Sequence, residues 1–300
     1  MKIIKILFLL VFSFSSFLKF DFASLIYTDV LSTKGVRKID SHVERVAKRY
    51  GGSFYSQELA AFVPEDPERI RRKWKKYKDT LAERIGYIPN QFCIQRAVWK
   101  NSAQTVDELL EDAHKAAFDF RKKCELVAAM TGGSCSFGPQ NKMICKSKAS
   151  AERKIAKDVV NLNVPCSYAV EKLSDVLRGS IIVSQPEQIS KVAGAIKKVF
   201  ASHSDHVLFR NLWQEERESG YVAIHAKILF PVPGNKYEKY VIAEIQIHLD
   251  SIVNGSMECV KEREHLLYEK VREGSQEAEP VSAASTLLYL SAFKQKICFK

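Results

Sequence analysis

Residues 173–183 read LSDVLRGSIIV and are the most informative segment of this 300-residue chain. The mainly apolar run Leu177 to Val183 predicts a buried β-strand. The Ser184-x-x-Glu187 spacing that follows predicts a helix capping box. After it, apolar residues recur at helical spacing: Ile189, Val192, Ala193, Ile196, Val199 and Phe200. A strand followed directly by an amphipathic helix indicates a sheet against which helices pack.

Two alternating segments further along the chain extend this sheet. Apolar residues occupy every second position in 222–230 and again in 241–247, and the turn-forming Pro233-Gly234-Asn235 lies between them. This pattern predicts a β-hairpin that is buried on one face. Two more helices, at about 252–273 and 280–294, are expected to finish the chain. We therefore predict an α+β fold with a mixed or antiparallel sheet flanked by helices.

The polar residues of the last strand share one face. If Ala243, Ile245 and Ile247 face the core, then Glu244, Gln246 and His248 must point to the opposite side. Such a row is either a candidate site or an ordinary solvent face. Asp175 opens the 177–183 strand and would lie beside Glu244 if the two strands were neighbours. A carboxylate pair of this kind favours a divalent cation with oxygen ligands.

The region from about residue 40 to 130 is predicted to be mainly helical. Asp66-Pro67-Glu68 is typical of a helix start, and Thr105-x-x-Glu108 is a capping box for a second helix that ends at Gly132-Gly133. The first helix carries a basic face from Arg71 to Lys78. That face fits a nucleic acid or an anionic membrane, and it equally fits a solvated helix surface.

The first 25 residues form a separate segment. Lys2 and Lys5 precede an apolar, Ser-rich run from Ile6 to Leu18, which is typical of a secretory signal peptide. A membrane span needs about 20 apolar residues, so this run is short for one, and no stable span is expected after its removal. Basic residues follow closely, so an uncleaved segment would act as a signal anchor. We expect a secreted or periplasmic protein if the segment is cleaved, and a cytoplasmic one if it is an anchor.

The composition describes a globular chain that prefers anionic partners. Hydrophobic residues make up 46% of it, which excludes a disordered chain. The 46 basic and 35 acidic residues leave a net charge of +11, which favours phosphate-bearing partners. Seven dispersed cysteines show no zinc-finger spacing. Either one disulfide forms among Cys124, Cys135 and Cys145, or these residues are buried thiols.

Five motifs, in order and spacing, resemble the RelA/SpoT-type synthetase domain. They are Lys146-Ser147 with Ser150 and Lys154; Leu173 to Val183; Gly220-Tyr221-Val222-Ala223-Ile224-His225; Ala243-Glu244-Ile245-Gln246-Ile247-His248; and Glu264-His265 with Tyr268 and Lys270. The resemblance covers residues 140–272. We therefore divide the chain into the segment 1–25, a helical region 26–139, and a nucleotidyltransferase-like domain 140–300. The resemblance includes no hydrolase domain, and we interpret His203-Ser204-Asp205-His206 as a turn before a strand.

The resemblance implies an activity and a set of site residues. The family moves pyrophosphate from ATP to a ribose 3′-hydroxyl, usually of GDP or GTP, with Mg²⁺ as cofactor. Asp175 and Glu244 are the implied Mg²⁺ ligands and catalytic residues, and Glu244 is also expected to draw the hydroxyl proton. Tyr221 is expected to stack on the acceptor base, and His225 to contact a phosphate or sugar. The other implied substrate-binding residues are Lys146, Ser147, Lys154, Arg178, Gln246 and His248.

Two positions depart from the family pattern. Ile144 stands where the long synthetases have an arginine, which bears on donor binding, with Lys142 and Lys148 as nearby substitutes. His248-Leu249 stands where the family has Arg-Thr, which bears on recognition of the acceptor. Glu264, His265 and Tyr268 share a predicted helix and are interpreted as support for the site.

Three hypotheses follow for function. The first is a synthetase, delivered as an effector or toxin into another cell because ATP is scarce outside the cytoplasm, with a nucleotide or the 3′ end of tRNA as acceptor. The second is a catalytically silent nucleotide-binding protein of the same fold. The third is an envelope protein with accidental motif matches. Retention of both Asp175 and Glu244 favours the enzyme, because a pure binding protein has little use for a costly carboxylate pair.

Overall fold

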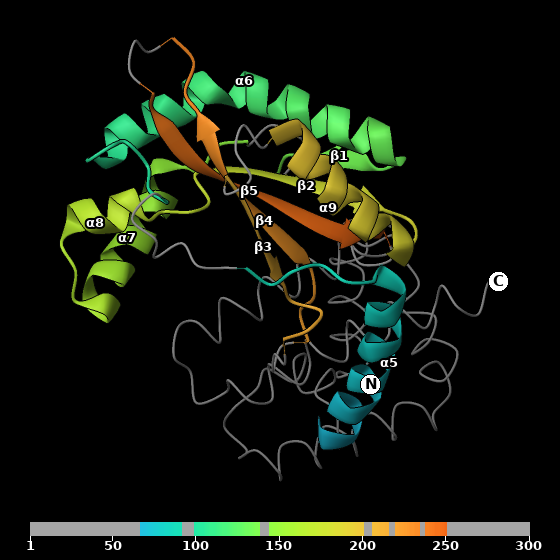
Figure 1. Cartoon of the computed structure of the whole chain (residues 1–300). Helices are drawn as coiled ribbons and strands as arrows, with labels where there is room; N and C mark the ends of the chain where they lie inside the picture. Colours follow the sequence, from blue (N-terminus) through green and yellow to red (C-terminus); the bar gives the residue numbers. More distant parts are fainter. Residues whose placement is uncertain are drawn as a thin grey trace, which may run out of the picture. The chain divides into compact units, whose positions relative to one another are not determined.

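The computed structural model describes residues 67–91, 99–138, 144–200, 206–215, 220–234 and 238–250 (Figure 1). Several predictions from the sequence lie outside the described residues: the signal segment 1–25, the helices at 252–273 and 280–294, Lys142, the 203–205 turn, and the motif from Glu264 to Lys270. The chain divides into two compact units. One comprises Tyr77–Glu216 and Val222–Asp250, and the other comprises Met1–Lys76, Arg217–Tyr221 and Ser251–Lys300.

Within the described residues, five strands form one mixed sheet in the order β1-β2-β5-β4-β3. Their bounds are β1 Ser134–Ser136, β2 Leu177–Val183, β3 Val207–Asn211, β4 Ile224–Pro231 and β5 Tyr240–Leu249. Strands β2 and β5 are parallel, and the other pairs are antiparallel. The predicted strand 177–183 and the predicted hairpin are therefore confirmed, as is the α+β class with a mixed sheet and flanking helices.

Two long helices cover the apolar face of this sheet. They are α6, Val106–Thr131, and α9, Pro186–Phe200 (Figure 1). Phe120 of α6, Phe200 of α9 and Phe230 of β4 pack together, with ring centroids 5.6 to 6.0 Å apart. Because side chains alternate along a strand, residues such as Lys227 of β4 and Glu244 of β5 face the other side of the sheet.

Helix α6 begins and ends as its sequence predicts. The Thr105 side chain accepts from the Glu108 backbone N–H, and the Glu108 carboxylate accepts from the Thr105 backbone N–H. Gly132 ends the helix with a φ of 65°, a left-handed conformation that favours glycine. Although α6 precedes residue 140, it belongs to the same compact unit as the sheet because its apolar stripe packs on β2 and β4.

The capping prediction for α9 was wrong by one residue. The carboxamide of Gln188 accepts from the Gln185 backbone N–H at 2.9 Å. Glu187 instead forms a salt bridge with Arg84, with Nε 2.8 Å from Oε1. The helix begins at Pro186, which places Gln188 at the third helical position, from which a side chain reaches the N-cap.

Three further helices are described: α5 Pro67–Ile85, α7 Lys148–Leu162 and α8 Cys166–Glu171. The sequence placed Lys78 on the basic outer face of α5, and this was wrong. Lys78 lies four residues after Trp74, hence on the apolar stripe, and its Nζ donates to the Glu215 carbonyl at 2.7 Å.

The cysteines of the described residues are free thiols. Cys124 is buried, and burial raises the pKa of Cys135 to about 12 and that of Cys145 to about 11. This agrees with the buried-thiol alternative for Cys124, whereas Cys135 and Cys145 are free thiols that are only half-buried. Within the part of the chain that the structure describes, no helix is both long and apolar enough to span a membrane.

Candidate active site

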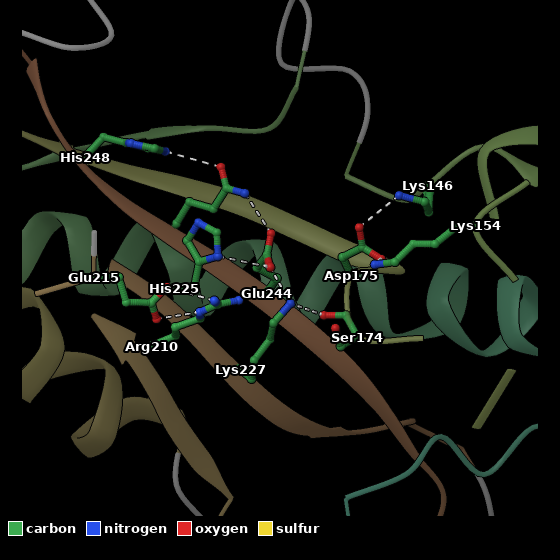
Figure 2. Close-up of polar contacts among 11 residues, drawn as sticks. Lys146, Lys154, Ser174, Asp175, Arg210, Glu215, His225, Lys227, Glu244 and His248 are labelled. Carbon is green, nitrogen blue, oxygen red and sulfur yellow. Dashed lines mark hydrogen bonds and ion pairs between the residues drawn. The ribbon is translucent and has the colours of Figure 1, made fainter. Parts of the chain in front are cut away.

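The predicted polar row on β5 is present on the side of the sheet away from α6 and α9. The Gln246 Nε2 donates to Glu244 Oε1 at 2.7 Å, and His248 Nε2 lies 3.2 Å from Gln246 Oε1. Glu244 and His248 are buried, and Gln246 is half-buried. The row is therefore not an ordinary solvent face, because its side chains are buried or half-buried. They also form hydrogen bonds with one another (Figure 2).

A lysine that the sequence reading missed extends this row onto β4. Lys227 pairs in register with Glu244, and its Nζ donates to Glu244 Oε2 and, at 2.6 Å, to the Ser174 carbonyl. Lys227 is only 4% exposed. The alternation of Ile224, Ala226 and Ile228 is a signal that could have found it, since that pattern sends Lys227 to the polar face.

Asp175 lies just before β2 and binds two lysines. Lys146 Nζ lies 2.9 Å from its Oδ2, and Lys154 Nζ lies 2.9 Å from its Oδ1. Lys146 is held by its backbone, because its N–H donates to the Val176 carbonyl at 2.8 Å. Lys154 comes from the second turn of α7. The structure thus brings two predicted donor-binding lysines together on a predicted metal ligand.

Ser147, which belongs to the same motif as Lys146 and Lys154, caps a helix. Ser147 is the N-cap of α7, and its hydroxyl accepts from the Ser150 N–H at 3.4 Å. Ile144, the departure from the family pattern, lies along the edge of β2, where its carbonyl accepts from the Arg178 N–H at 2.9 Å. Arg178 itself is in register with Glu244 on the neighbouring strand and has an exposed side chain.

Electrostatics keep both carboxylates ionised. Burial raises the pKa of Asp175, but the charges of Lys154 and Lys146 outweigh burial and hold that pKa well below its ordinary value. Burial also raises the pKa of Glu244, and the nearby Lys227 and His225 nevertheless lower it to about 2. The charge of Asp175 raises the Glu244 pKa in turn, so the two carboxylates are close enough to interact.

The predicted neighbourhood of Asp175 and Glu244 depends on the pairing of their strands. Strands β2 and β5 are adjacent and parallel, with Leu177 opposite Ala243. Asn101, also missed from the sequence, ties their ends together. Its Nδ2 donates to the carbonyls of Val170 and Leu173, and its Oδ1 accepts from the Ile242 N–H at 2.7 Å.

A further ion pair, between Arg210 and Glu215, flanks the row on the β3 side. His225 Nδ1 lies 3.7 Å from Glu244 Oε2, and Arg210 pairs in register with His225. The Arg210 guanidinium makes two contacts of 2.8 Å with the Glu215 carboxylate (Figure 2). Tyr221 is half-buried and belongs to the other compact unit, so its stacking role stays a prediction.

Comparison with known proteins gave matches only among solved structures. No family model matches the chain, and no curated protein matches it. Small alarmone synthetase 1 from Bacillus subtilis is 17% identical, with a TM-score of 0.41, over 65% of this chain and 98% of that one. A GTP pyrophosphokinase family protein from Streptococcus pneumoniae is 15% identical, with a TM-score of 0.45, over 63% and 90%.

A third solved structure is the complex between the type VI effector Tas1 and its immunity protein. It is 18% identical to this chain, with a TM-score of 0.43, over 63% of this chain and 96% of that one.

Proposed function

We propose that this protein transfers pyrophosphate from ATP to the ribose 3′-hydroxyl of a nucleotide acceptor. One observation carries the proposal: two ionised, buried carboxylates lie among cationic side chains on one face of the sheet. The carboxylates are Asp175 and Glu244, and the cations are Lys146, Lys154, Arg178 and Lys227. Phosphoryl-type transfer needs little covalent chemistry from a protein, and needs mainly positioning and cations where negative charge accumulates.

The reaction balances without a covalent enzyme intermediate. The acceptor 3′-oxygen bonds to the β-phosphorus of ATP, the bond from that phosphorus to the α,β-bridging oxygen breaks, and AMP leaves. The hydroxyl proton leaves the acceptor for solvent. Because the Glu244 pKa is about 2, this carboxylate orients the hydroxyl by accepting its hydrogen bond and is a poor store for its proton.

Mg²⁺ suits the donor set of this site. Asp175 and Glu244 offer anionic oxygens, which Mg²⁺ prefers, and we assign both as its ligands. Two carboxylates are few ligands for Mg²⁺, and the phosphates of the donor would supply others. When bound, the ion would supply positive charge to the phosphates of the donor.

The remaining predicted roles belong to the same proposal. Lys146, Lys154 and Arg178 hold the donor phosphates, His225 contacts the acceptor, and Tyr221 stacks on its base. GDP or GTP is the proposed acceptor, and an adenine nucleotide or the tRNA 3′ end is the alternative. With a signal segment at residues 1–25, we propose that the enzyme is exported and acts as an effector after delivery to another cell.

A transfer assay tests the activity and its acceptor together. The full chain is incubated with γ-labelled ATP, Mg²⁺ and, separately, GDP, GTP, ADP, ATP and total tRNA. We expect label on one acceptor with the wild-type chain and none with Asp175→Asn or Glu244→Gln. Binding of nucleotide without any transfer would instead support the catalytically silent protein. Transfer that survives in Asp175→Asn would remove Asp175 from the site.

A further inference from the structure

Every oxygen of the carboxylate pair already accepts a hydrogen bond. Asp175 Oδ2 and Oδ1 accept from Lys146 and Lys154, at 2.9 Å each. Glu244 Oε2 accepts from Lys227, and its Oε1 accepts from Gln246 at 2.7 Å (Figure 2). Three of these four oxygens therefore face ammonium groups, which occupy the positions where a metal ion would approach.

The three lysines differ in how easily they leave. The Lys227 side chain is buried and also donates to the Ser174 carbonyl. If it left Glu244, the buried carboxylate would lose the ammonium group that pairs with it, which is costly. The Lys154 side chain is 33% exposed and the Lys146 side chain 10% exposed. Lys154 in particular reaches Asp175 from the end of a long flexible stem and has solvent beside it.

The charge balance of the pair disfavours a free divalent cation. Three ammonium groups surround two carboxylates, and residue Arg178 is in register with Glu244 on the neighbouring strand. A divalent ion that enters alone meets a net positive charge and is repelled. A polyphosphate brings several negative charges and offers the lysines acceptors as strong as the carboxylate they leave.

On the basis of the proposed function, we propose that this site takes a divalent metal only as a metal–polyphosphate complex. The ammonium groups of Lys146 and Lys154 pass from Asp175 to phosphate oxygens, and the released carboxylate holds the metal. Lys227 remains on Glu244 Oε2, and Glu244 offers the metal its Oε1, which faces the neutral Gln246 amide. Ion pairs are exchanged in this step, and no covalent bond forms or breaks.

Mn²⁺ binding tests the exchange without measuring activity. The affinity of the full chain for Mn²⁺ alone is measured by electron paramagnetic resonance of the free ion. The affinity for the Mn²⁺ complex of the α,β-methylene analogue of ATP is measured by equilibrium dialysis. Both are compared in the wild-type chain, in Lys154→Met, and in the matched control Lys191→Met, whose side chain is exposed on α9.

Lys154→Met should move the two affinities in opposite directions. Loss of the ammonium group should tighten binding of Mn²⁺ alone by about tenfold, because repulsion falls, and should weaken binding of the Mn²⁺–analogue complex by about tenfold. Lys191→Met should change neither. If Lys154 had only a structural role, its substitution would weaken binding of Mn²⁺ alone and of the Mn²⁺–analogue complex alike. Affinities that change in the same direction, or not at all, therefore overturn the proposal.

Two further measurements keep the test decisive. Lys146→Met should give the same crossover, and it replaces Lys154→Met if that variant fails to fold. A wild-type dissociation constant for Mn²⁺ alone below about 10 μM overturns the proposal without any variant, because the resident lysines would then exclude nothing. If the analogue complex does not bind the wild-type chain, the proposed function fails as well; binding without the crossover overturns only the exchange.

Discussion

The pair of Glu244 and Lys227 should dominate the stability of the sheet unit, and Glu244→Gln should reveal it. The variant keeps the shape of the side chain, but it removes the negative charge that faces the buried Lys227 ammonium and leaves the hydrogen bond of that ammonium to the Ser174 carbonyl. The fall of the Glu244 pKa from 4.5 to about 2 corresponds to about 3 kcal/mol of preference for the ionised form. Breaking a buried ion pair by removing one partner typically costs about 3–5 kcal/mol.

A double-mutant cycle separates the pair from its surroundings. Glu244→Gln and Lys227→Met should each lower the free energy of unfolding by about 3 kcal/mol. The double variant should lie within about 1 kcal/mol of the wild type, because neither charge is then left buried alone. Urea denaturation followed by tryptophan fluorescence measures this, since Trp99 and Trp213 are buried.

The pH dependence has a definite sign. A carboxyl whose pKa is lowered by folding stabilises the protein above its ordinary pKa of 4.5, and this stabilisation is lost as pH falls toward 2. The wild type should therefore lose about 2 kcal/mol from Glu244 between pH 6 and pH 3, and Glu244→Gln should lack that loss. Surface changes typically alter the free energy of unfolding by no more than about 0.5 kcal/mol. A Glu244→Gln variant that lies within this range of the wild type at pH 7 would refute the ion-pair reasoning. A double variant as unstable as both single changes added together would refute it too.

Three other predictions concern the acceptor, the joint between strands and the packing of β2. Tyr221→Ala should raise the acceptor KM more than it lowers kcat, since base stacking is worth about 1–3 kcal/mol; an unchanged KM in steady-state kinetics would remove Tyr221 from the site. Asn101→Ala should cost about 2–4 kcal/mol in urea denaturation, because it leaves the Ile242 N–H and buried carbonyls without their partner, and a cost below about 1 kcal/mol would contradict this. Gly179→Val should lower the free energy of unfolding by about 1–3 kcal/mol, because a Cβ at residue 179 would lie 3.0 Å from the Phe137 ring. Thermal unfolding measures this, and Gly194→Ala is the control because a Cβ there meets nothing within 4 Å.

Experiments on catalysis must take account of this stability cost. Loss of transfer in Glu244→Gln alone would not separate a lost metal ligand from a weakened sheet. Asp175→Asn carries a similar cost, because the Asp175 and Lys146 side chains are each only 10% exposed and the change removes the negative charge that faces Lys146 and Lys154. We expect transfer to be lost in Asp175→Asn, and urea unfolding of the same sample should show that the variant is still folded under the conditions of the assay.

The sequence alone predicted several of the elements and the face that their side chains take, whereas β1, α7 and α8 were not predicted individually. The strand Leu177–Val183, the hairpin around residue 233 and the capping box of α6 are local patterns, because backbone geometry and side-chain alternation act within a few residues. The shared face of Glu244, Gln246 and His248 follows from the same alternation. The shift of the α9 cap by one residue shows the limit of such patterns, since Ser184 and Gln185 offer competing starts.

Only the tertiary structure decided which faces meet. Lys227 reaches the Ser174 carbonyl across 53 residues, and Lys146 reaches Asp175 across 29. The parallel pairing of β2 with β5 brings the carboxylates of Asp175 and Glu244 close enough for their charges to interact. A periodic pattern specifies the side of a strand on which a residue lies but not the neighbour that the strand will pair with. That choice is made by burial of the whole apolar face under α6 and α9, and the lysines of the site are drawn together as a consequence.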